Sequence, residues 1–245
     1  MSLPELELQI IYARIAWGLV AASMLLSVLP TVLPKIFPQL ARRTKAIVIG
    51  TVALMMVLPG EASPAHWLTL VFQYPSGLLT GYSLVALLAR WRERPVIFPL
   101  HPAFALLLTV IGVVLYLDAF GVIAVGLYYR GFDSGAAAVL TVAAAVAGAA
   151  AVYFRYAGTA GAALLTSVLL FSLLRLPSGN LWDALLDPLL WAWAVGSVIW
   201  AAVRRYQARK AALLAPVVPP VEVDVEPELA QARAAAIDIE QVQYK

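Results

Sequence analysis

Six charged residues, placed in two segments that separate apolar runs, form the strongest candidate for a chemical site. They are Asp118, Arg130, Asp133, Arg175, Asp183 and Asp187. Asp183 and Asp187 are four residues apart and share a face on a helix. With Asp118 they could bind a cation, a glycan headgroup or a partner loop. The alternative is that these charges only solvate the outer face and that the aspartates pair with Arg130 and Arg175, since spacing alone does not make side chains converge.

Asp118 stands out in this set because it directly follows an uninterrupted apolar run. A charged side chain buried at membrane depth is costly, and it marks a functional position with a paired ion. If Asp118 is buried, we therefore expect Arg130 or Arg175 to be its partner.

A second candidate site lies within the apolar runs themselves. Its residues are Arg14, Gln73, Tyr74, Ser76 and Thr80. Arg14 either snorkels to the outer interface or forms an interior ion pair. Pro75 predicts a helix kink. Broken helices line substrate sites in transporters, but proline kinks are also tolerated in packed membrane helices.

Other residue types exclude several chemistries. The chain has no cysteine, so thiolate nucleophiles, disulfides and cysteine metal sites are absent. His66 and His101 each precede a predicted span, one at the outer and one at the inner face of the membrane, and so are not expected to share one haem. None of the lysines lies inside a span, which excludes a retinal Schiff base. We therefore expect no cofactor and no metal, and we recognise no catalytic motif.

The composition indicates the structural class that must position these residues. Hydrophobic residues make up 62% of the 245 residues, charged residues 13%, and the mean hydropathy is +0.86, whereas soluble domains carry about 25% charged residues. Within lipid, the backbone N–H and C=O groups must hydrogen-bond to one another, so apolar runs of roughly 20 residues predict transmembrane helices. We predict an all-α polytopic membrane protein with a bundle of about seven transmembrane helices. The spans are expected near residues 8–33, 46–58, 67–89, 102–117, 135–153, 159–174 and 188–203.

Two short segments and a tail complete the predicted organisation. Residues 119–133 and 175–187 are expected to be interfacial amphipathic segments on the outer face. The bundle ends near residue 210. Residues 211–245 are expected to form a cytoplasmic, proline-rich acidic tail that could contain a short amphipathic helix.

The stretch 134–151 is unusually rich in small residues, which allow membrane helices to approach closely. We expect the fifth and sixth spans to form a tight hairpin covered by neighbouring helices. Its predicted packing positions are Gly135, Gly148, Gly158 and Gly161.

Basic residues concentrate on one side of a seven-span arrangement, which predicts a cytoplasmic C-terminus and an external N-terminus. These topological determinants, which could also contact anionic lipid, are Arg42, Arg43, Lys45, Arg90, Arg92, Arg94, Arg204 and Arg205. Their short clusters at span ends do not indicate nucleic-acid binding. The alanine-rich, lysine-poor composition suggests a bacterial inner membrane.

Three functions are compatible with this sequence. The first is a non-catalytic subunit that scaffolds or regulates a cell-envelope enzyme or transport complex. Whatever its function, the chain is expected to contact the lipid bilayer and either another membrane protein or further copies of itself, and its tail could dock a partner. The second is a small transporter, channel or lipid flippase that uses Arg14, the Pro75 break and Asp118. The third is a membrane enzyme acting on a lipid-linked substrate at the outer face.

Overall fold

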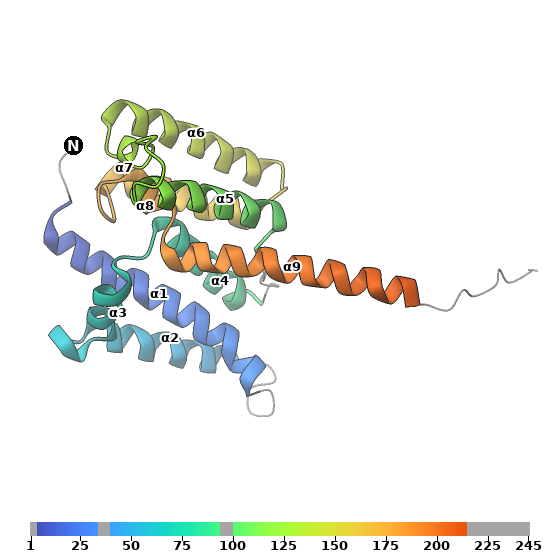
Figure 1. Cartoon of the computed structure of the whole chain (residues 1–245). Helices are drawn as coiled ribbons and strands as arrows, with labels where there is room; N and C mark the ends of the chain where they lie inside the picture. The colour runs from blue at the N-terminus through green and yellow to red at the C-terminus, as the bar shows by residue number, and fades with distance from the viewer. Residues whose placement is uncertain (1–3, 34–39, 94–99, 215–245) are drawn as a thin grey trace, which may run out of the picture. The chain divides into compact units, whose positions relative to one another are not determined.

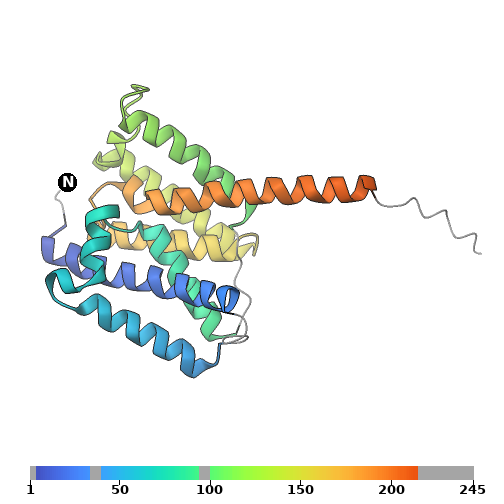
Figure 2. The same cartoon turned by 60° about the horizontal axis from the view of Figure 1, so that its bottom comes forward.

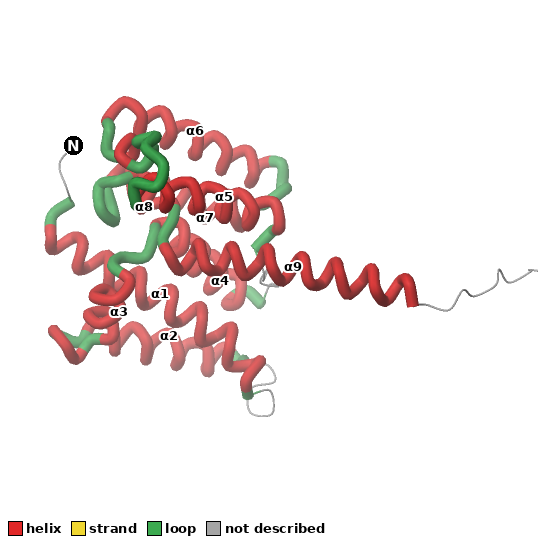
Figure 3. Tube along the Cα trace, viewed as in Figure 1, coloured by secondary structure: helices red, strands yellow, loops and turns green. Residues whose placement is uncertain are grey.

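The computed structural model describes residues 4–33, 40–93 and 100–214, and this part of the chain contains helices and loops but no strand (Figure 3). The all-α prediction is confirmed. Three helices are long and apolar enough to cross a membrane: α1 (Leu6–Val32), α5 (Pro102–Ala119) and α6 (Ser134–Tyr153). The chain is therefore compatible with a membrane protein.

The remaining helices are shorter or less apolar. They are α2 (Arg42–Val57), α3 (Pro64–Phe72), α4 (Gly77–Trp91), α7 (Gly158–Leu174), α8 (Leu181–Leu185) and α9 (Pro188–Leu214), with 3-10 turns at Gly60–Ala62 and Tyr129–Gly131. The predicted span 67–89 is thus two helices, α3 and α4, because the chain breaks fully where only a kink was expected. The two outer segments contain little helix, namely the second 3-10 turn in 119–133 and α8 in 175–187.

Proline and capping residues set where several helices begin. Ser63 accepts the amide hydrogen of Ala65 at the start of α3, and Pro64 takes the first helical position, where its missing N–H costs nothing. Pro102 and Pro188 likewise open α5 and α9. These positions separate the continuous apolar sequence into discrete helices.

By its contacts the chain divides into two units, Met1–Ala202 and Val203–Lys245. In the first unit α2 packs on α1, α1 on α4, α4 on α7, and α7 on α6. Figure 1 shows this succession from α2 at the bottom of the view to α6 at the top, and Figure 2 shows the same helices after rotation. Most of the predicted tail, from residue 215 onward, lies outside the described residues.

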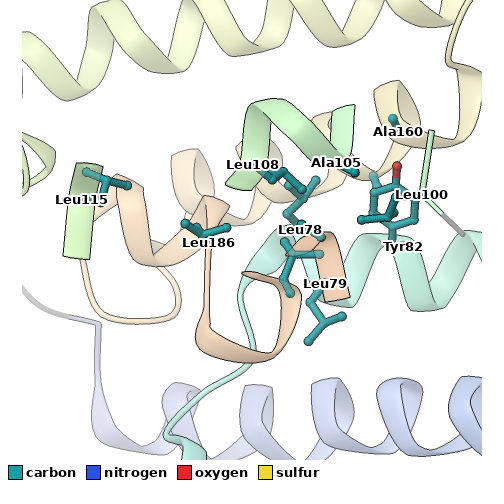
Figure 4. Close-up of a cluster of buried hydrophobic side chains, with 12 residues drawn as sticks. Leu78, Leu79, Tyr82, Leu100, Ala105, Leu108, Leu115, Ala160 and Leu186 are labelled. Carbon is teal, nitrogen blue, oxygen red and sulfur yellow. The ribbon is translucent and has the colours of Figure 1, made fainter. Parts of the chain in front are cut away.

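The main core gathers side chains from α4, α5, α7 and α9. Figure 4 shows Leu78 and Tyr82 of α4 together with Ala105 and Leu108 of α5, and all four side chains are buried. A second cluster joins Trp17 of α1 to α2 and α3. The shared core therefore attaches α5 and α9 to α4 and α7.

The hairpin of α6 and α7 is tight, but α6 is not covered as expected. Only 11% of the α6 span is buried inside the described structure. Val139, Val142 and Val146 are 70%, 63% and 64% exposed. The face of α6 away from α7 is therefore open to lipid or to another protein.

Candidate functional site

The break between α3 and α4 is the feature around which the candidate residues gather. The α3 helix ends at Gln73, whose φ of 61° is unfavourable for a residue with a side chain. Pro75 follows, which has no N–H to continue a helix. Ser76 then starts α4 by accepting the amide hydrogen of Leu79 at 3.1 Å. The break leaves backbone groups that need partners from elsewhere.

Two aromatic side chains of α1 satisfy carbonyl groups at the break. The hydroxyl of Tyr12 donates to the Pro75 carbonyl at 2.7 Å and lies 3.2 Å from the Thr80 hydroxyl. The indole of Trp17 donates to the Gln73 carbonyl at 3.3 Å. Both rings are buried, so α1 holds the break from one side.

Asp187 holds the break from the other side. Its carboxylate accepts the Ser76 amide hydrogen at 2.7 Å and the Leu190 amide hydrogen at 2.8 Å. One buried carboxylate therefore caps the N-termini of both α4 and α9, where the helix dipoles favour negative charge. The N-termini of helices that are broken within a membrane can bind anions from solution. Here the Asp187 carboxylate takes the place of such an anion.

An acidic cleft of about 320 Å³ opens beside this junction. Gln73 and Tyr74 from the break line it together with Ser178, Asp183 and Asp187. The structure thus brings residues of both predicted sites into one cleft. Carboxylate, amide and hydroxyl oxygens are ligands suited to a proton or a hard cation.

Asp183 contributes a hydrogen-bonded carboxylate to this cleft. Its carboxylate accepts hydrogen bonds from the hydroxyls of Tyr128, at 3.1 Å, and Ser178. Burial raises the pKa of Asp183 despite these two hydrogen bonds. Burial, with the Asp183 carboxylate nearby, also raises the pKa of Tyr128 to about 12. The raised pKa favours the protonated form of the Asp183 carboxyl.

A basic cleft of about 270 Å³ lies on the other side of Tyr74. Arg14, His66 and Thr69 line it with Tyr74. The Thr69 hydroxyl oxygen is buried and has no hydrogen-bond partner among the described residues. Arg14 therefore shares a cleft with Tyr74 but not with Gln73, Ser76 or Thr80.

The other outer aspartates and arginines serve local roles. Asp118 is buried, and its carboxylate accepts amide hydrogens of Val125, Gly126 and Tyr128 at 2.8–2.9 Å. It thus closes its own loop through the backbone, without the arginine partner that we expected. Asp133 caps α6 through the amide of Ala136.

Arg130 is exposed, and the Arg175 guanidinium lies 4.9 Å from the ring centre of Phe171. Neither arginine forms an ion pair in the described part of the chain, where Arg42 and Glu93 make the one salt bridge, at 3.2 Å. Of the six predicted outer residues, only Asp183 and Asp187 share a cleft.

Segments 119–133 and 175–187 contact each other, through residues that the sequence did not single out. The Trp182 indole donates to the Leu127 carbonyl at 2.9 Å, and the Asn180 amide donates to the Tyr128 carbonyl at 3.3 Å. Gly131 packs directly on Asn180, where a Cβ would clash. In the sequence, Asn180 after a glycine is a signal for a helix N-cap. That signal does not indicate contact with the loop at Leu127 and Tyr128.

Of the four glycines predicted to mark helix packing, two lie at a helix contact and two do not. A Cβ on Gly161 would lie 2.6 Å from the Gly148 carbonyl oxygen, so these two mark the closest approach of α6 and α7. Gly158 meets no atom within 4 Å, and Gly135 meets only Asp133. Gly77 and Gly81 were not selected from the sequence. Their four-residue spacing is nevertheless the signal for close membrane-helix packing, and both contact α7.

The basic residues include one tether between helices. The two terminal nitrogens of Arg90 donate to the Leu26 carbonyl at 2.6 Å and to the Ser27 hydroxyl at 2.7 Å. Pro30 has no N–H for the Leu26 carbonyl four residues earlier, so Arg90 replaces a bond that proline removes. The Lys45 ammonium in turn donates to the Arg90 carbonyl at 2.8 Å.

The remaining predicted basic determinants lie at the surface or beyond the described residues. Arg43, Arg92, Arg204 and Arg205 are exposed, and Arg94 lies outside the described residues. Within the described ranges, no group of three acidic or histidine side chains could hold a metal ion. Comparison with protein-family models, with curated proteins and with solved structures finds no match to this chain.

Proposed function

We propose that this chain is a non-catalytic subunit that scaffolds or regulates a cell-envelope enzyme or transport complex. In this proposal it is an integral protein of the bacterial inner membrane, with about seven spans, an external N-terminus and a cytoplasmic C-terminus. The observation that carries the proposal is the open face of α6. Its exposed residues are valines separated by alanines, which bury little apolar area in lipid but let a second helix come close.

The closed interior of the helix break supports the same function. Tyr12, Ser76, Thr80 and Asp187 are buried and hydrogen-bonded to one another or to the backbone. The polar centre is thus a structural joint, whereas a transport path needs polar groups free to receive a substrate.

Photo-crosslinking from the α6 face tests this proposal. A photoreactive residue replaces Val142 in α6 or, as the matched control, Val110, which is 53% exposed on α5. In native membranes, Val142 should give one discrete protein adduct and Val110 should give none. Absence of a protein adduct at Val142 would refute the subunit function. An adduct of twice the chain mass would replace it with a homo-oligomer.

The acidic cleft favours transport as a second candidate function. A broken helix beside two carboxylates is an arrangement found at ion sites of transporters. Proteoliposomes containing the purified chain should then take up protons or monovalent cations. Asp183→Asn should abolish uptake, whereas Asp133→Asn, which alters an exposed helix cap, should not. Equal uptake by both variants and by empty liposomes would exclude this function.

A further inference from the structure

A third cavity, distinct from the two clefts at the helix break, runs along the groove between α1 and α4. Its volume is about 380 Å³, within the range of small-ligand sites. Val20 and Met24 of α1, Leu79 and Ala86 of α4, and Trp193 of α9 form much of its apolar wall. Neither the scaffold nor the transport proposal uses this groove.

The length of the groove fits one acyl chain. On α4 its lining extends from Leu79 to Arg90, which corresponds to about 16 Å at a rise of 1.5 Å per residue. Half the hydrocarbon thickness of a bilayer is about 15 Å. The groove therefore spans about one leaflet, as a lipid tail does.

The charge at one end of the groove fits an anionic headgroup. Arg90 lines that end, and a guanidinium has five N–H donors. Arg90 gives one hydrogen bond to α1 from each of its two terminal nitrogens, and each of these nitrogens has a second N–H for a further acceptor. The Lys45 ammonium lies 2.8 Å from the Arg90 carbonyl oxygen. Arg90 therefore places one cation at the end of an apolar groove of leaflet length.

We propose that this groove binds one anionic phospholipid, with an acyl chain along α1 and α4 and the phosphate on Arg90. The bound lipid belongs to the cytoplasmic leaflet if the proposed topology holds, but the site itself does not depend on that topology.

Native mass spectrometry of the full chain in micelles tests this site. The probes are dioleoylphosphatidylglycerol and, as the zwitterionic control, dioleoylphosphatidylcholine. The unchanged chain should retain one phosphatidylglycerol molecule and at least about tenfold less phosphatidylcholine, because both lipids carry the phosphate but the choline ammonium beside it repels the Arg90 guanidinium. Equal retention of the two lipids, or a graded series of bound lipids without a preferred count of one, would overturn the proposal.

Two pairs of variants locate the site. Ala86→Phe fills the groove and leaves Arg90 intact, and Ala103→Phe places the same ring on an exposed position of α5. Ala86→Phe should lose the lipid and Ala103→Phe should keep it. Arg90→Gln should lose it, whereas Arg92→Gln, at an exposed position, should not.

Arg90→Gln also removes the tether to α1, so Ala86→Phe decides the matter if the arginine variant fails to fold. Retention of the lipid by a folded Ala86→Phe variant would refute the site. Displacement of a stoichiometric protein, rather than a lipid, by the same variant would assign the groove to a partner helix and would also refute it.

Discussion

At the scale of single residues, several polar side chains form hydrogen bonds with backbone groups that a helix break, a helix start or a proline leaves without a partner. Tyr12 and Trp17 bind carbonyl groups at the break around Pro75, and Asp187 binds the amides of two helix starts. Arg90 binds the carbonyl that Pro30 leaves without a partner. A lipid environment makes an unsatisfied backbone group cost several kcal/mol, which explains why polar residues occur where the helices are irregular.

The Arg90 tether predicts a coupling between two distant positions. Arg90→Met should lower the free energy of unfolding by roughly 2 kcal/mol, because it removes two charged hydrogen bonds. In a Pro30→Ala background the loss should be smaller by about 0.5–1 kcal/mol, because alanine at that position supplies the missing N–H to the Leu26 carbonyl. Denaturant unfolding in mixed micelles measures both values. Additive effects would contradict the tether, and Arg92→Met should change stability by less than about 0.5 kcal/mol.

Asp183 predicts a dependence of stability on pH. Its pKa is raised in the folded state, so folding favours the protonated carboxyl, and this contribution is complete only below the unfolded pKa. The stability that it contributes is therefore lost as the pH rises from the unfolded pKa through the raised folded value. Asp183→Asn keeps an acceptor for the Tyr128 hydroxyl and should flatten that part of the Tm–pH profile while raising the Tm at pH 7. An unchanged profile would contradict the role given to Asp183.

At the scale of elements, close helix contacts depend on glycine at a few positions. Gly81 of α4 lies against Ala163 of α7, and an added Cβ would lie 2.7 Å from the Ala163 carbonyl oxygen and 2.9 Å from its Cα. These are backbone atoms, so they cannot move aside as a flexible side chain does. The α4–α7 pair therefore behaves as one packed unit.

This contact predicts opposite effects for two glycine substitutions. Gly81→Ala should destabilise the protein by about 1–3 kcal/mol through overpacking. Gly50→Ala is the matched control in α2, where no atom lies within 4 Å of the new Cβ. It should be neutral or stabilising by up to about 1 kcal/mol, since alanine favours helix. Unfolding in micelles measures both variants, and equal destabilisation would show that helix contact is not the cause.

Much of the element pattern could be predicted from the sequence because it depends on local signals. Apolar length located α1, α5 and α6, and Pro75 located the break between α3 and α4. The completeness of the break was not predictable, because it depends on partners from α1 and from Asp187. The same holds for the site. Ser76 and Asp187 are 111 residues apart, and no periodicity reports a contact at that separation.

At the scale of the whole molecule, the proposed topology gives a direct test. The chain has no cysteine, so single cysteines can be introduced without other changes. Cysteines at Glu61 and Tyr129 should react with a membrane-impermeant maleimide in intact cells, because the proposed topology puts both positions outside. Cysteines at Ala41 and Tyr156 should react only after the membrane is permeabilised. A reversal at either pair would refute the seven-span arrangement.

The bond between Arg90 and Leu26 also imposes an order on biogenesis. The two residues are 64 positions apart, so α1 leaves the ribosome long before its proline-freed carbonyl has a partner. In the same way, Tyr12 and Trp17 lack their hydrogen-bond acceptors until Gln73 and Pro75 have been synthesised. The hydrogen bonds of α1 are thus incomplete until α4 has been synthesised. If the chain spans a membrane as proposed, we expect insertion and folding of this half to be coupled, and a truncation that ends before α4 to be degraded faster than the full chain.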